Sequence, residues 1–99
     1  MGTFFLSEII GLSRKGVPQI LINRANIVYS VIEKYPAIVP KIIVGINKIP
    51  SFELRSGKKV VSIDIVNPSW IEYRRGRQRK QSSLFNRKIL NELCQWVTT

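Results

Sequence analysis

The sequence predicts a small α+β protein in which N-terminal helices precede an antiparallel meander of three or four strands and an amphipathic helix ends the chain. Two observations predict this class. Apolar residues recur at helical spacing near both ends of the chain, and short β-branched runs separated by Gly, Pro and Asn fill its middle. A length of 99 residues with 44% apolar side chains is typical of one domain, which we expect to span residues 1–99.

Two helices are expected in the N-terminal third of the chain. The first covers residues 3–14, where apolar side chains share one helical stripe. That stripe consists of Phe5, Ile9 and Leu12. The second covers residues 18–35, because its apolar side chains recur at alternating intervals of four and three before Pro36. The alternative for the second segment is a strand at 19–22 followed by a shorter helix that begins near Asn26.

Three or four segments in the middle of the chain are predicted as strands. Residues 41–46 form a short β-branched run between two prolines. Residues 51–55 and 59–65 flank Ser56-Gly57, and the second segment alternates apolar and polar side chains, which is typical of a hairpin with one buried face. Residues 70–73 follow a turn and either add a further strand or begin a helix. The cluster of Trp, Ile and Tyr in this segment favours the strand.

The last helix is predicted over residues 83–97, with Ser82 or Ser83 as its N-cap. Its apolar stripe consists of Phe85, Ile89, Leu93 and Trp96. Helical spacing therefore predicts that Phe85 belongs to the core. Cys94 lies beside this stripe, and we expect a small buried side chain there. The alternative for the cysteine is a disulfide that links two copies of the chain.

The composition excludes several classes of site and indicates where the protein acts. Without any His and with one Cys, the chain cannot form a Ser-His-Asp triad, a histidine metal site or a multi-cysteine metal site. We therefore expect a protein that is not an enzyme and holds no metal or cofactor. No apolar run reaches about 18 residues, so no membrane span is predicted, and the absence of a basic stretch at the start of the sequence indicates an intracellular location. The isoleucine-rich, alanine-poor composition resembles that of small proteins from thermoacidophilic archaea and their viruses, which adds virion association as an expected location.

Positive charge is concentrated in one stretch of the chain. The sequence has 16 basic and 6 acidic residues and a net charge of +10. Residues 74–88 contain no acid, and their basic members are Arg74, Arg75, Arg77, Arg79, Lys80, Arg87 and Lys88. Because residues 74–81 include no apolar side chain, we expect an arginine-rich loop at 74–82. Guanidinium groups match phosphate oxygens, so the sequence predicts non-enzymatic nucleic-acid binding through phosphate-backbone contacts, with DNA favoured over RNA.

Other residues are candidates for the same interface. Trp70 and Tyr73 precede the expected loop, where they either stack on bases or belong to the core. Lys58 and Lys59 flank the predicted hairpin turn and either contact a phosphate or keep the turn soluble. A homodimer would double the cationic surface and cover exposed sheet edges.

Two other functions are consistent with the sequence. The basic surface fits a structural or interaction module that docks on an acidic protein partner. Separately, Asp64 on one strand and Glu72-Tyr73-Arg74 on the next resemble the PD-(D/E)xK arrangement of metal-dependent nucleases, with Glu33 as a further carboxylate. The chain departs from that pattern because Arg74 replaces the lysine and Ile63 precedes the first carboxylate where proline is common. The resemblance therefore implies a degenerate nuclease.

Overall fold

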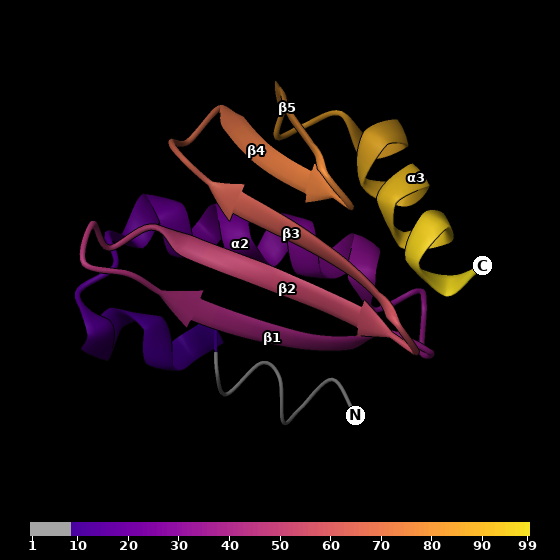
Figure 1. The fold of residues 1–99 in the computed structure, drawn as a ribbon. Coiled ribbons are helices and arrows are strands. Elements are labelled where there is room, and N and C mark those ends of the chain that lie inside the picture. Colours follow the sequence, from indigo (N-terminus) through magenta and orange to yellow (C-terminus); the bar gives the residue numbers. More distant parts are fainter. Residues whose placement is uncertain (1–8) are drawn as a thin grey trace.

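The computed structural model describes residues 9–99, which form a five-stranded antiparallel sheet with helices on one face (Figure 1). In chain order the elements are η1, a 3-10 helix (Gly11–Lys15), α2 (Gln19–Ile32), β1 (Val39–Val44), β2 (Pro50–Ser56), β3 (Lys59–Ile65), β4 (Trp70–Arg75), β5 (Gln78–Ser83) and α3 (Arg87–Thr98). The strands are neighbours in the order β1-β2-β3-β4-β5, so the sheet is a simple meander. The predicted α+β class is confirmed, whereas the predicted number of strands is wrong.

The additional strand lies where a basic loop was expected at 74–82. β4 continues to Arg75, Gly76 and Arg77 form a turn, and β5 pairs with β4 along its whole length. The prediction of a loop is therefore wrong. β5 is an edge strand with exposed or half-buried side chains, so burial imposes no apolar alternation on its sequence. Its pairing depends on backbone hydrogen bonds to β4, which a polar sequence makes equally well.

The N-terminal helices agree in part with expectation. The segment at 3–14 reaches into the described residues only at its end, where Ile9 and Leu12 are buried as the stripe predicts; Phe5 lies outside the described residues. α2 is one continuous helix, so the alternative with a strand at 19–22 is wrong. A single helix buries apolar side chains at four successive turns, which a strand followed by a short helix cannot do.

The core lies between the helices and one face of the sheet, and the buried side chains form one cluster. β2 and β3 contribute their alternate residues to this cluster, which are Phe52, Leu54, Val61, Ile63 and Ile65. The intervening residues of the same strands point to the opposite face, which α2 and α3 do not cover (Figure 1). We call this opposite side of the sheet the open face. No helix of residues 9–99 is long and apolar enough to cross a membrane.

α3 begins later than its apolar stripe predicts. Ser83 still pairs with Trp70 in the sheet, and the backbone N–H of Leu84 donates to the carbonyl of Ser69 over 2.9 Å. The cap is Asn86, whose Oδ1 accepts from the backbone N–H of Ile89 over 3.3 Å. The predicted serine cap is therefore wrong. Phe85 precedes the helix and is 53% exposed, so its predicted place in the core is also wrong.

Candidate nucleic-acid interface

Two hairpin turns lie at the same end of the sheet. Gly57 and Lys58 connect β2 to β3, and Gly76 and Arg77 connect β4 to β5. Because β2 and β4 run in the same direction within the antiparallel meander, both turns leave the sheet at one end. The register pairs Val61 with Arg75, so the second turn begins beside the start of β3. Strand pairing therefore places two turns that are far apart in the sequence at the same end of the sheet.

The two turns have the same local chemistry. Each has two central residues, and in each the first of them is a glycine with positive φ, 61° at Gly57 and 62° at Gly76. A positive φ at this position is typical of a type II′ turn and favours glycine, which has no Cβ. The second central residue is basic in both turns, Lys58 in one and Arg77 in the other. Two equivalent turns thus present a lysine and an arginine at the same end of the sheet.

Further cations surround these turns, and we call the group the basic end. Its members are Lys58, Lys59, Arg74, Arg75, Arg77, Arg79 and Lys80. In the antiparallel ladder Arg74 faces Arg79 on the open face, while Arg75 and Lys80 belong to the helix-covered side. Like charges directly opposite each other on neighbouring strands destabilise a sheet. The position of Arg74 opposite Arg79 therefore does not contribute to the stability of the folded protein.

Only some of these cations have partners within residues 9–99. Arg79 forms an ion pair with Glu72, with 3.3 Å between Nε and Oε1. Lys59 and Arg75 both contact Trp96. The remaining four are exposed and make no ion pair with a described carboxylate, namely Lys58, Arg74, Arg77 and Lys80. These four side chains are available to an anionic partner.

The structure does not bring Arg87 and Lys88 to the basic end. Both lie on the first turn of α3, which follows the end of β5 opposite to its turn. They are exposed, and the first turn of α3 contains no acidic residue. The run of positive charge at 74–88 is therefore divided between the two ends of β5.

The aromatic candidates occupy different environments. Tyr73 is half-buried and packs against the core, which agrees with the core alternative. Trp70 is 49% exposed, but it begins β4 and so lies at the end of that strand away from the turn. Neither ring is placed beside the two turns. A further aromatic residue, Trp96, contacts Lys59 and Arg75 of the basic end, whereas its spacing in the sequence placed it only in the apolar stripe of α3.

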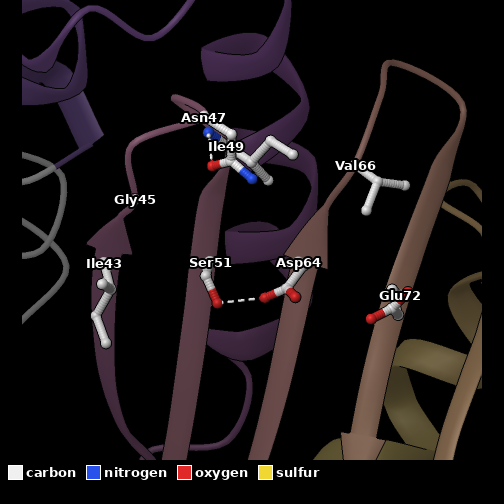
Figure 2. A pocket seen from close by; sticks show the side chains of 8 residues that line it. All are labelled: Ile43, Gly45, Asn47, Ile49, Ser51, Asp64, Val66 and Glu72. Atoms are coloured by element: carbon white, nitrogen blue, oxygen red, sulfur yellow. Dashed lines mark hydrogen bonds between the residues drawn. The ribbon is translucent and has the colours of Figure 1, made fainter.

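A hollow of about 370 Å³ on the open face contains two of the three carboxylates that suggested a nuclease (Figure 2). Asp64 and Glu72 face each other in the register of β3 and β4, and the hydroxyl of Ser51 donates to Asp64. Glu33 follows the last residue of α2, on the helix-covered side, and does not line the hollow. Within residues 9–99, no group of three His, Cys, Asp or Glu side chains could hold a metal ion. The described carboxylates thus supply a pair, without the third ligand that the resemblance implied.

Cys94 is buried in the core cluster, in agreement with the expected small buried side chain. Burial raises the pKa of its thiol to about 11. A thiol with this environment is protonated at neutral pH and is not presented to a second chain.

Comparison of the chain with protein-family models, with curated proteins and with solved structures found no match. The functional argument therefore depends on the geometry and charge of the basic end.

Proposed function

We propose that the protein binds nucleic acid without catalysis, by contacts between the basic end and the phosphate backbone. The observation that supports this most directly is the pair of glycine turns at one end of the sheet, with Lys58 and Arg77 at equivalent positions. Arg74 and Lys80 extend the cationic surface to both sides of the second hairpin. Arginine and lysine side chains without a carboxylate partner contribute most to the free energy of phosphate binding, because no internal ion pair has to be broken first.

The shape of the basic end favours backbone contacts over the reading of bases. The second turn begins beside the start of β3, so the β4–β5 hairpin does not project far beyond its neighbours. A hairpin that enters the major groove has to extend from the body of the protein as a two-stranded ribbon. A blunt end instead places its cations against phosphates, which carry no sequence information. We expect DNA to be the partner, and RNA is the alternative whose affinity is compared with that of DNA.

The proposal predicts a binding affinity that falls steeply with salt. Neutralisation of about four phosphates gives a slope of about −4 for log affinity against log salt concentration on duplex DNA. Labelled duplex DNA, single-stranded DNA and RNA of one length are titrated at several salt concentrations, and fluorescence anisotropy is measured. Affinity that does not depend on salt would contradict the proposal.

A charge-matched pair of variants locates the interface. Lys58→Gln with Arg77→Gln removes two positive charges from the turns, and Arg87→Gln with Lys88→Gln removes two from α3 at the other end of β5. We expect the first pair to weaken binding by about tenfold or more and to reduce the steepness of the salt slope by about two. The second pair should change both quantities less. Equal effects of the two pairs would show that overall charge, and not the basic end, determines binding.

Two further results would replace the proposal by another function. Capture of an acidic protein by the basic end, without affinity for any nucleic-acid probe, would favour the docking module. Magnesium-dependent cleavage of the probes that disappears in the Asp64→Asn variant would favour the nuclease.

A further inference from the structure

Trp96 connects the two hairpins of the basic end. Lys59 Nζ lies 5.1 Å from the centroid of the Trp96 ring, and Arg75 Cζ lies 5.9 Å from the same centroid. Lys59 Nζ also donates to the backbone carbonyl of Trp96 over 3.3 Å. Lys59 is the first residue after the β2–β3 turn, and Arg75 is the last before the β4–β5 turn. One residue of α3 therefore holds a cation from each hairpin.

The environment of these two cations explains why an aromatic ring is suited to this position. Lys59, Arg75 and Trp96 are all half-buried, and neither cation forms an ion pair with a carboxylate of residues 9–99. The negative face of an indole ring attracts a cation without neutralising its charge. The C-terminal end of a helix, where the Trp96 carbonyl lies, also favours positive charge. Trp96 thus stabilises the two cations and leaves the net charge of the basic end unchanged.

We propose that Trp96 is a positioning residue of the basic end, which orders Lys59 and Arg75 before a phosphate backbone binds. This inference rests on the proposed function, because it concerns how the same surface is prepared for its ligand. Long cationic side chains lose conformational entropy when a ligand immobilises them, and prior ordering reduces that loss. Because the ring packs against the core through α3, the position of the two cations is tied to the folded body of the protein.

Two substitutions at position 96 separate positioning from packing. Trp96→Phe retains an aromatic face, and Trp96→Leu retains an apolar side chain without one. With duplex DNA as the probe, we expect Trp96→Leu to weaken binding by about fivefold and Trp96→Phe by less than about twofold. Trp70→Leu is the matched control, because Trp70 begins β4 and has no contact with the two cations. Melting temperatures measured in parallel identify any variant that is not folded.

A double-mutant cycle tests whether the effect of Trp96 acts through the two cations. In a background that carries Lys59→Gln and Arg75→Gln, Trp96→Leu should no longer weaken DNA binding. A loss of the same size in both backgrounds would mean that Trp96 acts only through stability, and the inference would fall. Equal affinities of wild type and Trp96→Leu would overturn it as well, while leaving the proposed function intact.

A fluorescence experiment tests the contact independently of any ligand. In a Trp70→Phe variant, Trp96 is the only tryptophan of the chain. We expect Lys59→Gln and Arg75→Gln in this variant to change the intensity and the emission maximum of Trp96, because two cations leave the ring. An unchanged spectrum would overturn the inference. If the wild-type protein bound no nucleic-acid probe while the spectrum changed, the proposed function would be wrong and the contact itself would be established.

Discussion

Leu84 and Phe85 are adjacent in the sequence and occupy opposite environments. Leu84 is fully buried, whereas Phe85 is 53% exposed and has the guanidinium of Arg24 at 5.2 Å from its ring centroid. We expect Leu84→Ala to lower the free energy of unfolding by about 2–5 kcal/mol, because it leaves a cavity in the core. Phe85→Ala should cost about 1 kcal/mol, the size of an exposed cation–π contact. Urea unfolding of both variants measures the difference, and a larger cost at Phe85 would contradict the described boundary of α3.

Cys94 makes stability depend on pH in the alkaline range. Burial raises the pKa of its thiol from 9.0 to about 11 in the folded protein. Between these values the unfolded chain loses the thiol proton while the folded chain keeps it, so the folded state binds more protons. The contribution of Cys94 to stability therefore falls as pH rises from about 9 to about 11.

The Cys94→Ala variant isolates this effect from the titration of lysines and tyrosines. We expect the wild type to lose unfolding free energy relative to the variant as pH rises from 8.5 to 10.5. Urea titrations at the two pH values measure it. A difference that does not change with pH would show that the thiol is exposed to solvent.

At the scale of an element, the β4–β5 hairpin depends on the conformation of Gly76. Its φ of 62° is one that residues with a Cβ adopt at a cost, although the space around it is open. We expect Gly76→Ala to lower the free energy of unfolding by about 1 kcal/mol. Gly11→Ala is the matched control, because that glycine has open space around it and no positive φ. The control should be neutral or slightly stabilising, and equal costs at the two positions would contradict the described turn.

The elements also show which local patterns are informative. α2 and β3 each have one buried side and one side that is less buried, and their apolar periodicity predicted them correctly. β5 has no buried residue, so its sequence contains no periodicity to detect. The start of α3 was predicted too early because apolar spacing continues from Phe85 into the helix, whereas β-pairing of Ser83 holds that segment in the sheet. Secondary structure was thus predictable where burial shapes the sequence and not where backbone pairing alone decides.

At the scale of the whole molecule, the meander determines which charges are neighbours. The two basic turns lie at the same end of the sheet because β2 and β4 run in the same direction, and Arg87 and Lys88 are separated from them by the length of β5. Sequence reasoning named all seven cations of the basic end, but it treated 74–88 as one surface. The homodimer expected from the sequence stays a prediction, for which the sheet edges at β1 and β5 are the natural places to look.

Composition and the local pattern of apolar residues were sufficient to establish the α+β class and the excess of positive charge. They also excluded catalytic or metal sites that need histidine or several cysteines. Folding into three dimensions was needed to establish that Lys58 and Arg77 lie at the same end of the sheet, that Glu72 forms an ion pair with Arg79, and that Trp96 contacts two other cations. The physical reason is the separation of these partners along the chain. Lys59 and Trp96 are 37 positions apart, and such contacts arise from strand register and helix packing, which no short stretch of sequence encodes.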